Sequence, residues 1–132
     1  MSMDTKIIAI PLGDPGGDKA LKCFRAPLDS DGGGVTILSA YAVNHAATGA
    51  GTSFSLALHR YSAAGTPVVN GTVAAAIGGT ASPWADGVPK SFALDDTYSF
   101  LDAGEWLAID YAEQTAGNPT NGYVVLQYVL GR

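Results

Sequence analysis

The 54 residues from Gly32 to Ala85 contain one charged side chain, that of Arg60. Across the whole chain 14% of the residues are charged, whereas roughly 25% is usual for a soluble domain. The stretch consists mainly of Ala, Gly, Thr, Ser and Val. Strands of this composition have one face for a core and a second face that is small and neutral. Because such a face normally meets another protein surface, the stretch predicts a protein that assembles with other chains.

Length and charge narrow the class of protein further. The 132 residues predict one domain over 1–132, large enough to fold without disulfides or a structural metal. The lone Cys23 cannot form an internal bridge. The net charge of -5 argues against a nucleic-acid-binding surface, which would need clustered Lys and Arg. No run of 18 apolar residues is present, so no membrane span is expected.

Short apolar runs separated by turn residues indicate an all-β protein. About eight strands at regular spacing predict an antiparallel sandwich or barrel, and a long last strand near the C-terminus favours a jelly roll. Two weak strands are expected around a hairpin turn at Asn70-Gly71. Residues 1–18 are expected either to drape over a neighbour as an extended arm or to form a first strand with a frayed end. The expected strands are 6–12, 20–26, 35–43, 53–61, 68–69, 72–77, 90–94, 98–101, 106–112 and 123–130.

Alternation along the strands predicts which side chains enter the core. The inward sets are expected to be Phe54, Leu56 and Leu58; Leu107, Ile109 and Tyr111; and Val124, Leu126, Tyr128 and Leu130. In the strand over 35–43, Leu38, Ala40 and Ala42 are expected to lie opposite Ile37, Ser39 and Tyr41. Neither set of this strand carries a charge, and two uncharged faces would promote aggregation of a lone monomer.

Two tryptophans and the neutral faces supply the candidate interface. Trp84 lies in a loop rich in Pro and Gly, and Trp106 lies opposite Leu107 and Ile109 in the alternation. Both rings could pack against neighbouring loops, anchor a protein interface or stack on a sugar. His59 lies on the neutral side of its strand, where an interfacial hydrogen bond is expected. The candidate interface residues are Trp84, Trp106, Tyr123, Val125, Val129 and His59.

No motif for catalysis or metal binding stands out. The segment Gly51-Thr52-Ser53-Phe54 is not a nucleophile elbow, and Asp95-Asp96 is interpreted as a turn. The segment Asp29-Ser30-Asp31-Gly32 resembles the start of a calcium loop, but its twelfth position lacks the glutamate. Cys23, His45 and His59 lack the local spacing of a metal site. We therefore expect no enzyme activity, no metal and no cofactor.

A recurrent hairpin connects the chain with a known family. The segments Lys90-Ser91-Phe92-Ala93-Leu94 and Leu101-Asp102-Ala103-Gly104-Glu105-Trp106-Leu107-Ala108-Ile109-Asp110 resemble a strand, an Ala-Gly-Glu turn and a strand found in small jelly-roll proteins of tailed bacteriophages. Over about residues 35–130 the chain is similar to phage head decoration (cement) proteins. The resemblance implies a virion protein on the outer capsid surface that forms dimers or trimers and bridges subunits of the major capsid protein.

Two other functions remain open from the sequence. One is a carbohydrate-binding or host-adsorption module, which would need Trp84, Trp106 or Tyr98 exposed together on one side. The other is a different head or tail assembly protein. For the decoration protein, the expected contacts with the head are the segment Met1 to Asp18 and the loop that contains Trp84.

Overall fold

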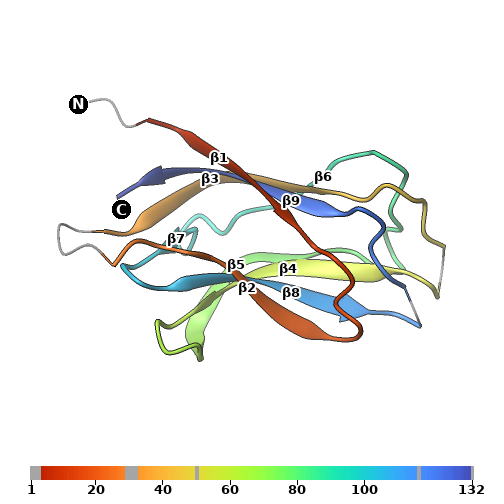
Figure 1. Cartoon of the computed structure of the whole chain (residues 1–132), viewed down its shortest axis with the longest axis horizontal. Coiled ribbons are helices and arrows are strands. Elements are labelled where there is room, and N and C mark those ends of the chain that lie inside the picture. Colours follow the sequence, from red (N-terminus) through yellow and green to blue (C-terminus); the bar gives the residue numbers. More distant parts are fainter. Residues whose placement is uncertain (1–3, 29–32, 50, 116, 132) are drawn as a thin grey trace.

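The computed structural model describes residues 4–28, 33–49, 51–115 and 117–131, and it places their strands in two antiparallel β-sheets that face each other (Figure 1). No helix occurs within these ranges. The strands are β1 (Lys6–Pro11), β2 (Lys19–Arg25), β3 (Val35–Val43), β4 (Phe54–Tyr61), β5 (Pro67–Gly78), β6 (Lys90–Ser91), β7 (Phe100–Leu101), β8 (Trp106–Glu113) and β9 (Tyr123–Leu130).

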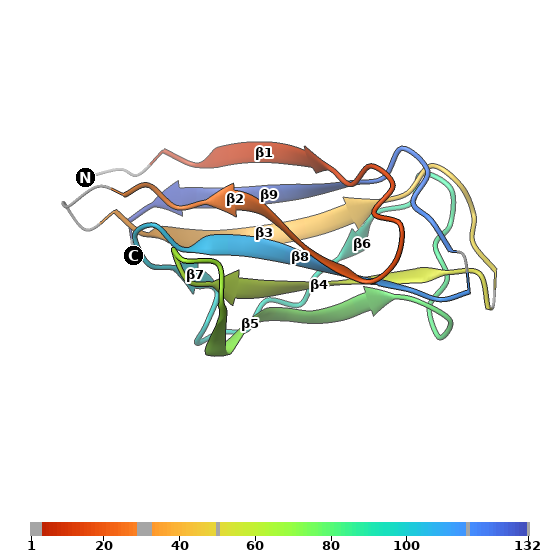
Figure 2. The same ribbon diagram turned by 60° about the horizontal axis from the view of Figure 1, so that its bottom comes forward.

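Strands from the first half of the chain pair antiparallel with strands from the second half, and the pairs are divided between two sheets. β1 pairs with β9, β2 with β8 and β4 with β5, while β3 pairs with both short strands, β6 and β7. Sheet A therefore has the order β1-β9-β3-β6, and sheet B has the order β2-β8-β4-β5 (Figure 2). This winding is that of a jelly roll. The predicted antiparallel jelly-roll-like sandwich is confirmed, with nine strands where about eight were expected.

The core lies between the two sheets and follows the predicted alternation over most strands. The side chains of Phe54, Leu56 and Leu58 are completely buried, and Leu107 and Ile109 lie beside them on the same face of the sheet, from the neighbouring β8. Burying one such side chain contributes about 1.5–3 kcal/mol, so these central strands supply a large part of the folding free energy. The register is strongly specified, because a slip by one residue would expose the whole inward set.

The expected hairpin at Asn70-Gly71 is wrong. β5 runs through both residues as one strand paired with β4. Between the partners His59↔Thr72 and Tyr61↔Pro67, β5 accommodates extra residues as a bulge, which explains the φ of 54° at Asn70. Pairing with β4 on both sides of the bulge keeps this segment in the sheet, although Asn-Gly favours a turn in isolation.

The expected strands over 90–94 and 98–101 are shorter than predicted, at two residues each. A side chain explains the interruption. The Asp95 carboxylate accepts hydrogen bonds from the backbone N–H groups of Thr97 and Tyr98, both at 2.8 Å. An Asp that bonds to the backbone two and three residues ahead stabilises a turn and competes with strand pairing.

A bulge in β3 changes the predicted face assignment. The pairing with β9 skips from Ile37↔Tyr128 to Ser39↔Gln127, so Leu38 is an extra residue. Ile37 consequently joins Ala40 and Ala42 in the core, and Leu38 is 47% exposed. The expectation that Leu38, Ala40 and Ala42 share one face is therefore wrong, because a bulge reverses the alternation beyond it.

The N-terminal segment contributes a strand to the sandwich. β1 pairs with β9 over its whole length, from Lys6↔Tyr128 to Pro11↔Tyr123, and Ile10 and Leu12 are buried in the core. Of the two expectations for this segment, the structure therefore has the strand and not the draped arm. Residues 1–3, in which a frayed end was expected, lie outside the described residues.

The only charge of the Gly32–Ala85 stretch points into the core. Arg60 continues the inward set of β4, and its side chain is 7% exposed. Its guanidinium donates from Nη2 to both oxygens of Glu105, at 2.8 and 3.1 Å, and lies 4.1 Å from the centre of the Phe100 ring. The Glu105 carboxylate also accepts the backbone N–H of Asp102 at 2.7 Å. This ion pair joins β4 of sheet B to the turn that leads into β8.

Removing one member of the ion pair should destabilise the fold more than removing both. Glu105→Gln leaves the buried Arg60 charge with only the half-exposed Asp102 carboxylate, at 3.4 Å, as its ionic partner, and we expect it to lower the free energy of unfolding by about 3 kcal/mol. The double variant Arg60→Met/Glu105→Gln should recover a large part of that loss, because no buried charge remains. Urea unfolding of the three proteins measures the difference, and a double variant less stable than Glu105→Gln alone would contradict the explanation.

Candidate interaction surface

Trp84 lies inside the sandwich and not on its surface. Its side chain is 2% exposed, and its ring stacks on Phe54 with the ring centres 5.0 Å apart. The indole Nε1–H donates to the Phe54 carbonyl at 2.8 Å. The prediction that Trp84 anchors an interface is therefore wrong. The loop over 79–89 folds back across the end of sheet B, which the local sequence did not indicate.

Gly78 makes room for this tryptophan. A Cβ at Gly78 would lie 2.6 Å from Trp84 Nε1, and the backbone there has a φ of +81°. Only glycine satisfies both conditions without displacing its neighbours. Trp84 and Gly78 thus form one packing unit that closes this end of the core.

The outer face of sheet A forms an extended uncharged surface. We call it the uncharged face. Among the described residues that point outward from β1, β9 and β3, none carries a charge. Three of its large apolar side chains are well exposed: Ile7 at 70%, Leu38 at 47% and Tyr41 at 37%. Its residues are Ile7, Ala9, Pro11, Thr36, Leu38, Ser39, Tyr41, Val43, Tyr123, Val125, Gln127 and Val129.

The predicted interface residues of β9 differ in how exposed they are on this face. Tyr123 and Val125 are half-buried and present part of their surface outward. Val129 is only 6% exposed, so its assignment as an interface residue is wrong. Leu130, which was expected inward, is 46% exposed because it lies at the end of its strand. In β9, alternation correctly predicts which side of the sheet Tyr123, Val125 and Val129 lie on. It does not predict how far neighbouring side chains bury each of them.

The outer face of sheet B has a different chemistry. Trp106 and Tyr61 are directly opposed across β8 and β4. The Arg25 guanidinium lies 5.0 Å from the centre of the Trp106 ring, and the Lys22 ammonium lies 5.3 Å from that of Tyr61. A bulge at Cys23 brings both cations to the same face, although they are three residues apart. Since cations lie over both rings, a sugar would have to displace them before it could stack.

His59 is engaged within its own sheet. Its Nε2 lies 3.2 Å from the Val68 carbonyl, which can only accept a hydrogen bond, so Nε2 carries the proton. The Thr72 hydroxyl lies 3.4 Å from Nδ1 and donates to it. With both nitrogens occupied, His59 stabilises the β4–β5 pairing, and the expected interfacial hydrogen bond would have to replace one of these contacts.

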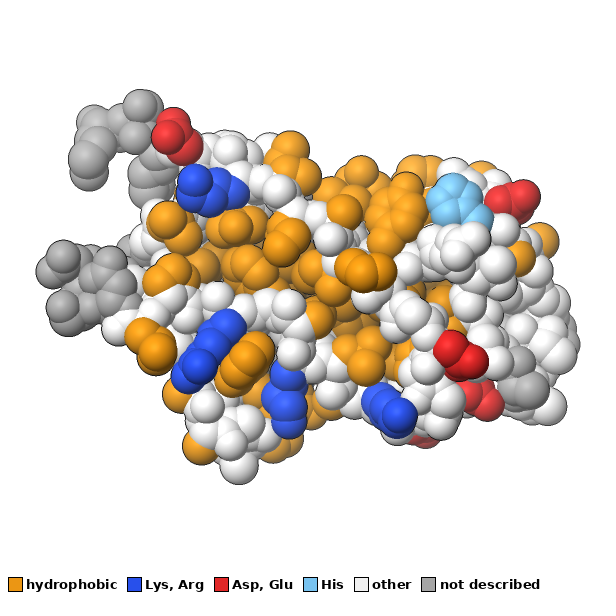
Figure 3. All heavy atoms as spheres, viewed as in Figure 1, with side chains coloured by type: hydrophobic (Ala, Val, Ile, Leu, Met, Phe, Trp, Pro, Cys, Tyr) orange, Lys and Arg blue, Asp and Glu red, His pale blue; other side chains and the backbone are white. Residues whose placement is uncertain are grey.

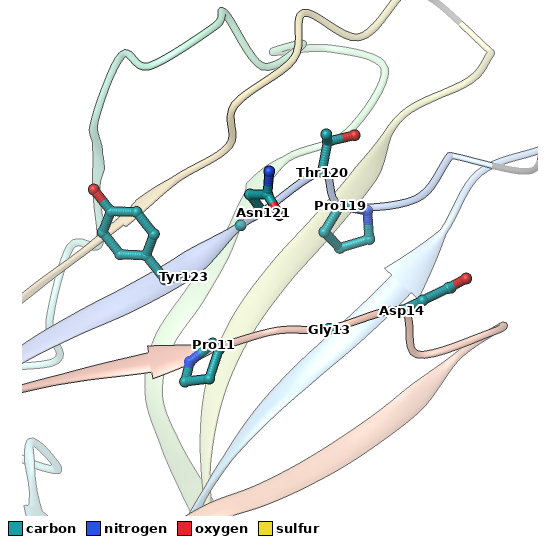
Figure 4. A pocket seen from close by; sticks show the side chains of 8 residues that line it. Pro11, Gly13, Asp14, Pro119, Thr120, Asn121 and Tyr123 are labelled. Carbon is teal, nitrogen blue, oxygen red and sulfur yellow. The ribbon is translucent and has the colours of Figure 1, made fainter.

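An open depression of about 570 Å³ adjoins one end of the uncharged face. It is formed by the β1–β2 and β8–β9 connections, and its lining residues are Pro11, Gly13, Asp14, Pro119, Thr120, Asn121, Gly122 and Tyr123. Figure 4 shows the Asp14 carboxylate directed away from the rings of Pro11 and Tyr123. Asp14 Oδ1 instead accepts the N–H of Gly16 at 3.2 Å. The depression therefore extends the apolar surface, with the Asp14 carboxylate as the only charged group in its lining.

The described residues do not assemble a reactive centre. Within them, no three His, Cys, Asp or Glu side chains come close enough to hold a metal ion. Burial raises the pKa of the Cys23 thiol to about 11, so little of the reactive thiolate is present at neutral pH. The calcium-loop candidate 29–32 lies outside the described residues. The described part of the chain also contains no helix with the length and apolar character that a membrane crossing requires.

Comparisons of the chain with protein-family models, curated proteins and solved structures found no match. The surface itself therefore carries the functional argument. The molecule has one uncharged face, one face on which cations lie over aromatic rings, and an open depression beside the uncharged face.

Substitution of Trp84 tests its assignment to the core. We expect Trp84→Ala to lower the free energy of unfolding by about 3–5 kcal/mol, because it removes a large buried side chain. Trp106→Ala should cost less than half as much, since Trp106 is partly exposed. Denaturant unfolding of both variants measures the two losses, and equal losses would contradict the difference in packing.

The half-buried carboxyl group of Asp110 should make the stability of the fold depend on pH. Desolvation raises the pKa of this carboxyl group, and nearby His59 lowers it by a smaller amount. The folded state therefore holds the proton more tightly than the unfolded state, and stability falls as pH rises through the folded-state pKa. We expect Asp110→Asn to raise the Tm at pH 7 and the gain to vanish below about pH 4. Asp96→Asn, at an exposed site, is the matched control and should leave the Tm unchanged at both pH values.

Proposed function

We propose that this chain is a structural virion protein that binds the outer surface of a phage head and bridges subunits of the major capsid protein. The uncharged face is the observation that carries the proposal. Exposed Ile7, Leu38 and Tyr41 give it the apolar character of the centre of a protein interface, where charged residues are depleted. The turn over 102–105, on which the resemblance to decoration proteins rests, supports the same function.

Binding to the assembled head would act by mass action. A protein that binds the expanded lattice and not its separate subunits stabilises that lattice in proportion to its occupancy. Several weak contacts per particle would add through avidity, so a sheet face of modest area is sufficient. The net charge of -5 suits a position on the outside of the shell, away from the packaged DNA.

Co-sedimentation with capsids tests the proposal. Heads of the source virus that lack this chain, both expanded heads and unexpanded procapsids, are incubated with the purified protein and pelleted. We expect saturable binding to expanded heads alone. Binding to neither particle would overturn the proposal, and retention on a glycan array would then favour the carbohydrate-binding alternative.

Matched charge insertions locate the binding surface. We expect Tyr41→Lys, on the uncharged face, to reduce binding to expanded heads by at least about tenfold, because a charge would be desolvated at the interface. Ala112→Lys places the same charge on exposed Ala112 of β8, in sheet B, and should bind as the unmodified protein does. Equal binding by both variants would show that the uncharged face is not the contact.

A further inference from the structure

The sandwich has five strands at sheet edges, β7 among them, and four of these strands, including the two-residue β7, carry features that prevent pairing with another chain. β2 carries Lys19, Lys22 and Arg25 and a bulge at Cys23. β5 begins at Pro67 and has three register shifts against β4. β6 is two residues long. Cations, proline, bulges and short length are the usual means by which proteins block unpaired strand edges.

β1 lacks these features along its centre. It pairs with β9 over six residues without a register shift, so its backbone is regular. The four residues from Ile7 to Ile10 are all apolar, and Ile7 is 70% exposed. Lys6 and Pro11 stand at the ends of the strand and limit its length, but they leave the centre unprotected. A regular, uncharged edge is the geometry to which a further strand adds.

The side of the molecule near β1 is also apolar. Ile8 of β1, Leu21 of β2 and Tyr128 of β9 are only partly buried and pack against the core, and β1 and β2 are edge strands of the two sheets. Figure 3, viewed with β1 and β2 in front, shows a band of hydrophobic side chains across this side, with Lys and Arg side chains below it and a further basic side chain at its upper left. A strand added to β1 would cover the upper part of this band, whereas the cations of β2 oppose addition at sheet B.

We propose that β1 pairs antiparallel with β1 of a second copy about a two-fold axis, which joins two copies of sheet A into one continuous sheet. A second copy fits this edge because the interaction is self-complementary: residue i meets residue j in both directions. The proposal does not depend on capsid binding, since it concerns the purified chain alone.

The symmetry restricts the register. On an edge strand, alternate residues direct their N–H and C=O groups outward, so symmetric antiparallel pairing must place partners whose residue numbers have an even sum. The register centred on Ile8 satisfies this condition and uses the whole unprotected segment. It places Ile7 opposite Ala9 and Lys6 opposite Ile10, with no like charges opposed. The two uncharged faces then lie side by side on one sheet.

The expected dimer is reversible. Pairing over one short strand buries less than the roughly 800 Å² per partner of a standard interface, so the dimer should dissociate on dilution. Sedimentation velocity of the purified chain over a range of concentrations should show a monomer–dimer equilibrium. A monomer at every concentration up to the solubility limit would overturn the proposal.

A lysine at the edge provides the first test by substitution. We expect Ile7→Lys to raise the dimer Kd by at least about tenfold, because it introduces the cation that the centre of this edge lacks. Val69→Lys is the matched control, since Val69 is 86% exposed on β5 and should leave the Kd unchanged. Thermal unfolding verifies that both variants are folded, as expected for substitutions at exposed positions. An unchanged Kd for Ile7→Lys, or an equal rise for both, would overturn the proposal.

Cysteine cross-linking tests the register. In a Cys23→Ala background, Ile7→Cys/Ala9→Cys should form a disulfide-linked dimer on mild oxidation, because positions 7 and 9 face each other across the two-fold axis within disulfide range. In the Ile7→Cys variant alone, the two Cys thiols of the dimer are diagonal and not directly opposite neighbours across the paired strands. Because they are farther apart, this variant should cross-link at least about tenfold more slowly. Absence of the covalent dimer, or equal cross-linking by both proteins, would overturn the register centred on Ile8.

Discussion

The ion pair between Arg60 and Glu105 is the constraint on which the packing at one end of the sandwich depends. Among the residues that the structure describes, it is the one place where a charge enters the core, and the Arg60 guanidinium contacts the Glu105 carboxylate and the face of the Phe100 ring. The same turn accepts a hydrogen bond from Arg25 Nε to the Gly104 carbonyl at 3.1 Å. Two strands of sheet B are thereby attached to the connection that arrives from sheet A. A buried guanidinium needs its partners, so this arrangement favours a single register of β4 against β8.

The opposite end of the sandwich is closed by packing and not by charge. Trp84 stacks on the Phe54 ring. The Tyr111 ring also contacts the Phe54 ring, in a tilted arrangement with the ring centres 5.6 Å apart. The Tyr111 hydroxyl donates to the Gly117 carbonyl, so the β8–β9 connection is held against the same cluster. Sheet A presents an uncharged surface and sheet B a surface of cations over aromatic rings, which makes the molecule two-sided in its chemistry.

The sequence predicted which face of a sheet a side chain lies on better than it predicted which side chains are exposed for an interface. Tyr123, Val125 and Trp106 lie on outer faces as the alternation indicated, but Trp84 and Val129 are buried. A Trp in a loop carries no periodic signal, and its position depends on where that loop folds. The pairs of Arg25 with Trp106 and of Lys22 with Tyr61 were missed for a similar reason, since a bulge at Cys23 changes the side on which Arg25 lies. The apolar depression joins two connections about a hundred residues apart in the chain, so no local pattern could indicate it.

The sequence by itself determined the all-β class, most strand positions, the inward sets of β4 and β8, and the scarcity of charge, because side-chain alternation and turn residues act over a few neighbouring positions. Only the tertiary structure decided that β5 is one strand, that Leu38 projects outward, that Arg60 is buried and that Trp84 closes the core. Each of these depends on pairing or packing with residues far along the chain. Long-range contacts of this kind outweigh local propensity, since they supply most of the burial that stabilises a β-sandwich.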